Sequence, residues 1–342
     1  MSVVIGWDIG GAHLKAARGE NGRVVAAIQV ASPLRLGLER LAAAFTEAKS
    51  AVGSAQRHVV SMTGELADTF TCRAEGVEQL AKLAVRELAP DPVVLYGGRA
   101  GLLAADHAAH HVEDIASANW YATASLVARA KKSALFMDMG STTTDIVPVG
   151  DGAVIARGYT DAERLRTGEL VYTGIVRGFL MATATRAPFA GTWTELVHEN
   201  FATMADVHRI LGTLPDDADM MTTADGRAKS VEASQARLAR MVGRDKDDAC
   251  DADWRALALW FAEAQLRAVM DGALLVLSRG QVPADAPIAG AGSGEAILRE
   301  TARRIGRDYI SFETLLDVSS GLRARASQCA PAAAIAALMS AD

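Results

Sequence analysis

The chain has few aromatic residues, few cysteines and no long apolar runs. Aromatic residues make up 5% of its 342 residues while half of all residues are apolar, so the core has to be mostly aliphatic. Cys72, Cys250 and Cys329 are far apart and show no Cys-x-x-Cys spacing, which argues against a zinc site or a disulfide framework and predicts reduced thiols. The apolar stretches, such as residues 273–277, are far too short to cross a bilayer.

The sequence also lacks an excess of basic residues and an N-terminal targeting pattern. Its 35 lysines and arginines are outnumbered by 41 acidic residues, which argues against a nucleic-acid partner. No basic region precedes an apolar one near the start, so we expect no signal peptide, no membrane partner and a cytoplasmic location. A chain of this length can form two domains with cores of their own.

The chain contains two similar glycine-rich segments. The first is IGWDIGGAHLK, from Ile5 to Lys15, and Asn21-Gly22 follows it. The second is FMDMGSTTTD, from Phe136 to Asp145, and Asp151-Gly152 follows it. The aspartates, the glycines and the second turns of the two segments are each 130 positions apart, which indicates an internal duplication.

Each segment predicts a strand that ends in an aspartate, a tight turn, a second strand and a hairpin turn. Backbone N–H groups and hydroxyls of such turns can bind phosphate oxygens, and an aspartate can hold Mg²⁺ through water. One copy alone could be an ordinary β-hairpin, but two copies in register favour a clamp that binds a polyphosphate from both sides. The expected phosphate-binding residues are Gly10, Gly11, Ala12, His13, Gly140, Ser141, Thr142 and Thr143. The expected catalytic, metal-facing residues are Asp8 and Asp138, with Lys15 as a phosphate contact.

The remaining patterns predict alternating strands and helices. Strands are expected at residues 3–8, 13–18, 24–30, 57–62, 93–96 and 309–312, and helices at residues 34–50, 77–88, 115–132, 254–279 and 331–340. Residues 160–252 are polar and poor in strand signals, so we expect a mostly helical insertion there.

The two segments resemble the phosphate loops of the actin, Hsp70 and sugar-kinase superfamily. A third motif, PIAGAGSGE from Pro287 to Glu295, fits the turn that packs against adenosine in that superfamily. The resemblance implies an α/β fold of two ribonuclease-H-like halves, residues 1–132 and 133–342, around a central phosphate-binding cleft. It also implies that Gly290, Gly292 and Ser293 contact a cofactor, with ATP or another nucleotide as the candidate.

Motifs in and near the insertion narrow the resemblance. They are MTGELAD (residues 62–68), RTGELVYTG (166–174), NFATMADV (200–207), TADGRAKS (223–230) and ARMVGRD (239–245). Together with GWDIGGAH they resemble the hydantoinase/oxoprolinase family, and within it the members linked to one-carbon transfer on tetrahydromethanopterin and methanofuran. The resemblance implies a transferase of methanofuran biosynthesis, in which the phenol oxygen of a tyramine or tyrosine derivative displaces diphosphate from an aminomethylfuran diphosphate. The expected partners are therefore small diphosphate and phenolic molecules, and the sequence leaves open a homo-oligomer.

Two other functions remain open. An ATP-dependent hydrolase of a cyclic amide, as in oxoprolinases, would use the same clamp for ATP. A non-catalytic, actin-like nucleotide switch is the third alternative, against which the polar insertion argues.

The sequence also predicts a general base and a second group of basic side chains. Glu65 follows a strand end, where sites of α/β proteins gather, and is a candidate catalytic carboxylate. Arg237, Arg240 and Arg244 have the spacing of one helix face. With Arg227 and Lys229 they form either a solvated stripe or a grip on the outer phosphate, for which we expect Arg227, Lys229 and Arg240.

Overall fold

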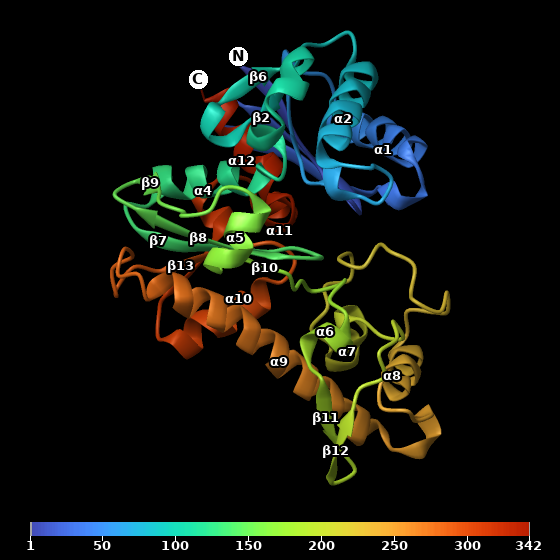
Figure 1. The fold of residues 1–342 in the computed structure, drawn as a ribbon. Coiled ribbons are helices and arrows are strands. Elements are labelled where there is room, and N and C mark those ends of the chain that lie inside the picture. Colours follow the sequence, from blue (N-terminus) through green and yellow to red (C-terminus); the bar gives the residue numbers. More distant parts are fainter. Residues whose placement is uncertain (1, 342) are drawn as a thin grey trace.

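A computed structural model describes residues 2–341 as two stacked α/β halves with an insertion beside them (Figure 1). Each half is built on a mixed sheet with helices on both faces, which is the two-halved fold of the actin, Hsp70 and sugar-kinase superfamily that the sequence predicts.

The first half has a seven-stranded sheet in the order β15-β3-β2-β1-β4-β5-β6. Its strands are β1 (Val3–Ile9), β2 (His13–Glu20), β3 (Arg23–Ala31), β4 (Arg57–Met62), β5 (Val93–Tyr96), β6 (Leu102–Ala104) and β15 (Asp317–Val318). The helices α1 (Leu38–Val52) and α2 (Arg73–Leu88) pack on its outer face, and the short α3 (Val112–Ile115) lies beside α2. Strand β1 is almost wholly buried because helices cover both of its faces.

The second half repeats this plan with a smaller sheet in the order β10-β8-β7-β13-β14, and β9 pairs with β8. Its strands are β7 (Ala134–Met139), β8 (Thr144–Gly150), β9 (Ala153–Val154), β10 (Leu170–Val171), β13 (Ile288–Ala291) and β14 (Tyr309–Ser311). The helices α9 (Asp251–Leu277) and α10 (Glu295–Ile305) cover its outer face.

Two helices between the sheets join the halves. Helix α4 (Asn119–Ala130) packs on β7 and β8, while α12 (Ala330–Ser340), which follows α11 (Arg323–Gln328), packs on β1 and β2. The approach of α12 is close because Gly6 and Gly19 face it, and a Cβ on either would clash with its backbone. Thus β15 and α12 return to the first half, which a division of the chain at residue 132 does not foresee.

The duplicated hairpins form as the sequence predicts. Asn21 and Gly22 both have positive φ, and so do Asp151 and Gly152, as a two-residue turn between twisted strands requires. The helix expected at residues 115–132 is wrong in one respect. The chain leaves α3 at Ile115, passes through Ser117 with φ of 52°, and starts α4 at Asn119.

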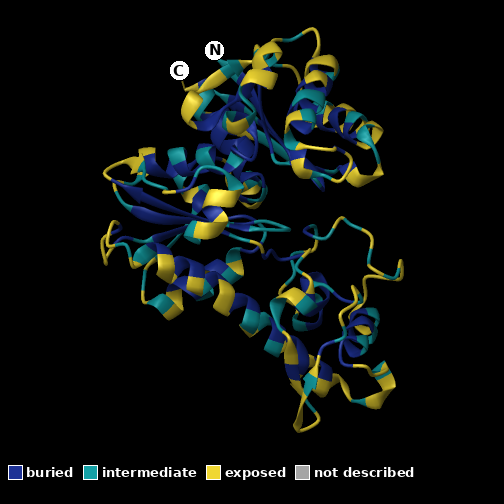
Figure 2. Cartoon of the chain, in the orientation of Figure 1, coloured by how far each residue is buried: buried dark blue, intermediate teal, exposed yellow. Residues whose placement is uncertain are grey.

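The insertion is a compact unit of short elements. It contains α6 (Leu180–Thr183), β11 (Arg186–Phe189), β12 (Thr192–Glu195), α7 (Met204–Leu211) and α8 (Val231–Arg240). Helix α5 (Asp161–Thr167) instead packs beside β10 in the second half (Figure 1), so the insertion is shorter than the expected residues 160–252. The hairpin β11–β12 was not expected from sequence. Trp254, Leu257 and Phe261 of α9 are buried in the insertion's core, so this helix spans the insertion and the second half (Figure 2).

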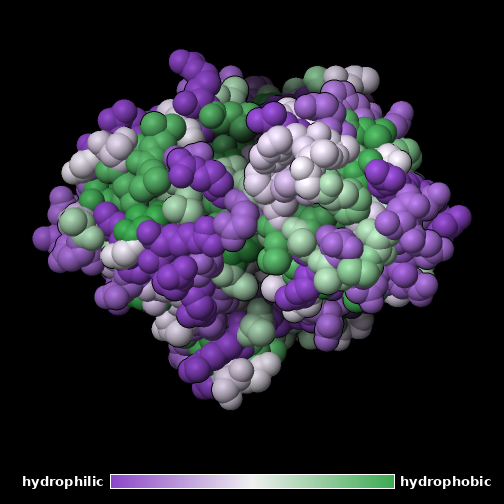
Figure 3. All heavy atoms as spheres, turned by 90° about the horizontal axis from the view of Figure 1, so that it is seen from below, coloured by the Kyte–Doolittle hydropathy of each residue, from purple (hydrophilic) through white to green (hydrophobic). Residues whose placement is uncertain are grey.

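The surface is a mosaic of polar and apolar side chains on the face seen from below (Figure 3). Within residues 2–341, no helix has the length and apolar character needed to cross a membrane.

Candidate active site in the cleft

Both glycine-rich turns open onto one cavity of about 350 Å³ between the two halves. Eleven of the predicted site residues line it, namely Asp8, Gly10, Gly11, Ala12, His13, Lys15, Asp138, Gly140, Ser141, Thr142 and Thr143. The duplication in the sequence therefore corresponds to two loops that share one site.

The two turns have matching backbone hydrogen bonds. The Gly10 N–H donates to the His13 carbonyl at 2.9 Å, and the Gly140 N–H donates to the Thr143 carbonyl at 3.0 Å. Among the hydrogen bonds of the described residues, none is donated by the N–H groups of the two residues that follow each glycine. Two pairs of free amides at a cavity wall are the arrangement that binds phosphate oxygens.

The acidic side chains of the cleft follow the strand register. Asp8 of β1 is opposite Lys15 of β2, and Lys15 Nζ is 3.9 Å from Asp8 Oδ2. Asp138 of β7 is opposite Asp145 of β8, so the second half has a carboxylate where the first has an ammonium. Arg164 of α5 donates to Asp145 at 2.9 Å and neutralises that carboxylate.

Burial governs the protonation of these groups. It raises the pKa of Asp8, and it raises the pKa of Asp138 to about 7. Burial opposes the charge of Lys15, but Asp8 and Asp138 outweigh it and raise the Lys15 pKa. The Lys15 ammonium opposes this rise at both aspartates, and a bound cation would act in the same direction.

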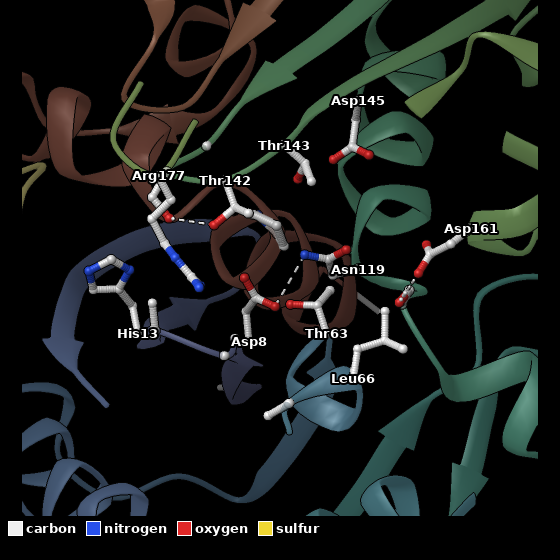
Figure 4. Close-up of a pocket in the computed structure, with 18 of the residues that line it drawn as sticks. Asp8, His13, Thr63, Leu66, Asn119, Thr142, Thr143, Asp145, Asp161 and Arg177 are labelled. Atoms are coloured by element: carbon white, nitrogen blue, oxygen red, sulfur yellow. Dashed lines mark hydrogen bonds between the residues drawn. The ribbon is translucent and has the colours of Figure 1, made fainter. Parts of the chain in front are cut away.

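His13 is neutral in this site. Burial, Lys15 and Arg177 lower its pKa to about 4. Its Nε2 atom is buried and has no partner among the described residues, and the ring lies near Arg177 in the close-up (Figure 4).

The donor set at the clamp fits Mg²⁺. No group of three or more His, Cys, Asp or Glu side chains forms a metal cage within residues 2–341. Mg²⁺ commonly needs only one or two protein carboxylates, because substrate phosphates and water complete its shell. Asp8 and Asp138, whose burial disfavours unbalanced negative charge, supply those two carboxylates.

The third glycine motif does not contribute to the cavity wall. Gly290 and Gly292 are buried in β13 and the turn after it, and Ser293 is half-buried there. A Cβ on Gly290 would clash with the Tyr309 hydroxyl, and one on Gly292 would clash with Asp138 and the Met139 backbone. Packing within the sheet therefore accounts for both glycines.

The insertion's basic residues also lie outside the cavity lining. Arg227 and Lys229 are exposed, and Lys229 pairs with Asp219 at 3.4 Å. The shared face predicted for three arginines is wrong, because α8 ends at Arg240 and Arg237 is fully buried between Asp206 and Asp225. Two acidic partners hold Arg237 in the insertion's core, so it cannot reach a substrate.

Glu65 lies one layer behind the wall, in the 3₁₀ helix η2 (Gly64–Leu66) after β4. It is 1% exposed, and burial raises its pKa to about 7. Its Oε1 accepts a hydrogen bond of 2.8 Å from Ser117, which does line the cavity.

The cavity has further wall residues that sequence reasoning did not select. Asn119 at the start of α4 donates to Asp8 at 3.2 Å (Figure 4). The others that bear on function are Arg35, Leu66, Ser117, Asp161, Arg164, Leu170, Tyr172, Arg177 and Met221. Leu66, Leu170 and Tyr172 belong to two of the sequence motifs named above, and Arg177 follows one of them. The rest become neighbours only through the tertiary fold.

The comparisons with known proteins agree with this geometry. A hydantoinase/oxoprolinase family profile matches residues 56–329. A curated protein of Methanocaldococcus jannaschii, named (4-{4-[2-(gamma-L-glutamylamino)ethyl]phenoxymethyl}furan-2-yl)methanamine synthase, is 36% identical over 187 residues, covering 54% of this chain and 56% of that protein. A protein of the same name from Methanococcus vannielii is 34% identical over 114 residues, covering 33% and 51%. The matched part of the chain thus spans about half the length of each curated relative.

A solved structure shares the fold. The nucleotide-free acetone carboxylase structure superposes with a TM-score of 0.61 at 12% identity, covering 99% of this chain and 70% of that one. Because the family profile spans most of the sequence, the chain belongs to the hydantoinase/oxoprolinase family.

Proposed function

We propose that this member of the hydantoinase/oxoprolinase family is a transferase that forms an aryl ether. In this reaction the phenol oxygen of a tyramine or tyrosine derivative displaces diphosphate from an aminomethylfuran diphosphate, a step of methanofuran biosynthesis. The names of the two relatives describe a product with this phenoxymethyl-furan linkage. A transfer to this chain is a proposal, because each match covers about half of the relative.

The observation that carries the proposal is the pair of matching turns with free amides on one cavity. The four free N–H groups, Lys15 and the exposed Arg177 would hold the diphosphate oxygens. Such fixed donors stabilise the negative charge that grows on the leaving group.

The rest of the cavity suits flat rings. Leu66, Leu170, Tyr172 and Met221 give it apolar surface beside the polar turns. Tyr172 is 65% exposed on its own, so a bound aromatic ring could cover it.

The bond changes set the remaining requirements. As the phenol oxygen bonds to the methylene carbon on the furan, the bond from that carbon to the phosphate oxygen breaks. The diphosphate leaves with the electron pair, and the phenol proton has to pass to a base. A Mg²⁺ held by Asp8 and Asp138 would supply charge neutralisation for the diphosphate. Asp161, on the wall away from His13 and Arg177, is a candidate carboxylate for the proton (Figure 4).

Cyclic-amide hydrolysis driven by ATP is the alternative reading of the same family. The packing of Tyr309 and Met139 against the third glycine motif favours the diphosphate substrate, because it explains these glycines without an adenosine group.

The test is to supply this chain with an aminomethylfuran diphosphate and a γ-glutamyl-tyramine, with Mg²⁺ and without ATP. We expect pyrophosphate and the ether in equal amounts. Orthophosphate release from ATP that depends on a cyclic amide would overturn the proposal in favour of the hydrolase. A parallel thermal-shift series with pyrophosphate, ADP and ATP would show which ligand the folded chain binds.

A further inference from the structure

A buried hydrogen-bonded chain links the cavity wall to Glu65. The Ser117 hydroxyl oxygen is 2.8 Å from Glu65 Oε1 and 3.1 Å from Asp161 Oδ2. Arg73 of α2 donates to the same Asp161 oxygen at 2.5 Å. These groups come from η2, the loop before α4, α5 and α2, so the chain assembles only when both halves are folded.

The number of protons on Glu65, Ser117 and Asp161 determines which hydrogen bonds this cluster can form. A hydroxyl has one proton and can donate to only one of the two carboxylates. When both carboxylates are ionised, the other one faces a lone pair of Ser117. One additional proton removes this conflict, because Glu65 then donates to Ser117 and Ser117 donates to Asp161.

Glu65 is the member that takes the additional proton. Arg73 stabilises the charge of Asp161, whereas Glu65 is buried, and its Oε2 has no partner among the described residues. The charged groups that face Glu65 are Asp161, which favours protonation, and Arg73, which opposes it. Burial outweighs both and raises the Glu65 pKa to about 7.

The backbone at Ser117 supports a functional reading. Its φ of 52° is in the left-handed region, which costs a non-glycine residue energy. This conformation, between the end of α3 and the start of α4, accompanies the placement of the hydroxyl between the two carboxylates. Strained residues of this kind gather at functional sites.

We propose that Glu65, through Ser117 and Asp161, stores the proton that the phenolic substrate loses in the cavity. The phenol O–H breaks as its oxygen bonds to carbon, and Asp161 takes the proton. Asp161 then donates to Ser117, and Ser117 passes its own proton to Glu65, which ends neutral. Product release and solvent remove that proton before the next cycle. The proposal rests on the ether-forming function.

The stored proton makes the transfer easier. A phenol has a pKa of about 10 and an ordinary aspartate one of about 4, so direct transfer to an isolated aspartate is strongly uphill. A final acceptor with a higher proton affinity closes much of that gap, which is how general bases are matched to their task. The base has to be ionised beforehand, so turnover should rise with pH through the titration of Glu65.

The experiment compares Glu65→Gln and Ser117→Ala with wild type and with Glu78→Gln, an exposed carboxylate of α2 that pairs with Lys82. For wild type and the control we expect kcat for pyrophosphate release to rise through about pH 7. Glu65→Gln and Ser117→Ala should lose this rise of kcat with pH. Their kcat should also be on the order of a hundredfold lower, which is the usual contribution of a general base. Variants that keep the wild-type kcat and its rise with pH would overturn the proposed proton transfer to Glu65.

Infrared difference spectra without substrate give a second measurement. Wild type should show a protonated-carboxyl band that disappears as the pH is raised through about 7, and this band should be weaker in Glu65→Gln, where Asp138 alone of the two carboxyls with a pKa of about 7 remains. Ser117→Ala, which keeps the acid, should keep a band. A band unchanged in Glu65→Gln would overturn the assignment of the proton. If no ether forms at all, the ether-forming function fails, while the infrared result still decides where the proton lies.

Discussion

At the scale of single residues, the cleft is arranged around a pair of positions that the duplication makes equivalent. Lys15 and Asp145 occupy the same register place in the two halves, and one carries a positive charge and the other a negative one. The sequence is enough to select Asp8, Lys15 and Asp138, because strand ends and glycine turns are local patterns. It could not show that Asp145 is neutralised by Arg164, since that contact depends on the position of α5.

The first prediction tests the two aspartates. Asp8→Asn and Asp138→Asn keep the size of each side chain but remove its charge. We expect each to lower kcat for pyrophosphate release by on the order of a hundredfold or more, because a charge that orders the phosphate site is lost. Circular dichroism and thermal unfolding should show an intact fold.

The matched control is Asp151→Asn, in the exposed turn of the second hairpin. Asp151 has a φ of 50°, and the equivalent position of the first hairpin is already Asn21 with a φ of 49°. The same chemical change there should leave turnover unaltered. Near-normal turnover of either cleft variant would contradict the two-sided clamp.

The second prediction concerns the cations that would hold phosphate. Arg177 lines the cavity, while Arg240 ends α8 outside the lining. Arg177→Lys keeps the charge but loses the paired donors, so pyrophosphate should bind about 1–3 kcal/mol more weakly. Arg240→Lys should change binding by less than about 0.5 kcal/mol. Calorimetric titration of both variants measures this difference, and equal affinities would remove Arg177 from the phosphate site.

At the scale of elements, the local patterns predict much of what forms. The alternation of strands and the Asn-Gly and Asp-Gly turns predicted both hairpins, because turn chemistry acts over a few residues. The register shift between Arg18 and Gly19 in the first hairpin was not predicted. The β11–β12 hairpin was missed, since its alternation is short and interrupted by Pro188. The arginine stripe was a reasonable helical pattern, but acidic partners distant in sequence buried Arg237.

The third prediction tests whether packing explains the glycine in β13. Gly290→Ala places a methyl group against the Tyr309 ring and hydroxyl of the neighbouring strand. Overpacking of this kind costs about 1–3 kcal/mol, so the urea midpoint should fall. Tyr309→Phe in the same background should recover part of the loss, because it removes the hydroxyl nearest to the new methyl.

Gly321→Ala is the matched control, since no atom lies within 4 Å of a Cβ there and its φ is not positive. Its stability should stay close to that of wild type. If Gly290→Ala unfolded at the same urea concentration as Gly321→Ala, the glycine would need another explanation, and an adenosine contact would be the first to consider.

At the scale of the whole molecule, the insertion reaches back over the cavity. Residues 213–230, which we call the strap, connect α7 to α8, and Met221 of the strap lines the cavity wall. Thr222 contacts Arg35 of the first half, and Asp217 accepts from Gln328 at 2.8 Å and pairs with Arg325 at 2.7 Å. No local pattern in the sequence predicts these contacts, because they join the insertion to elements at both ends of the chain.

The last prediction concerns how a ligand enters and leaves under the strap. Asp217→Lys replaces the ion pair with Arg325 by a repulsion between two cations, while Asp216→Lys makes the same charge change at an exposed neighbouring residue. An exposed pair of this kind contributes about 1 kcal/mol at most, so the strap should open more often without unfolding of the insertion. We expect pyrophosphate to leave Asp217→Lys up to about fivefold faster than wild type in a stopped-flow displacement experiment. The Asp216→Lys control should match wild type, because the strap keeps its contact with α11 there. Equal release rates in all three proteins would mean that the strap does not limit exchange.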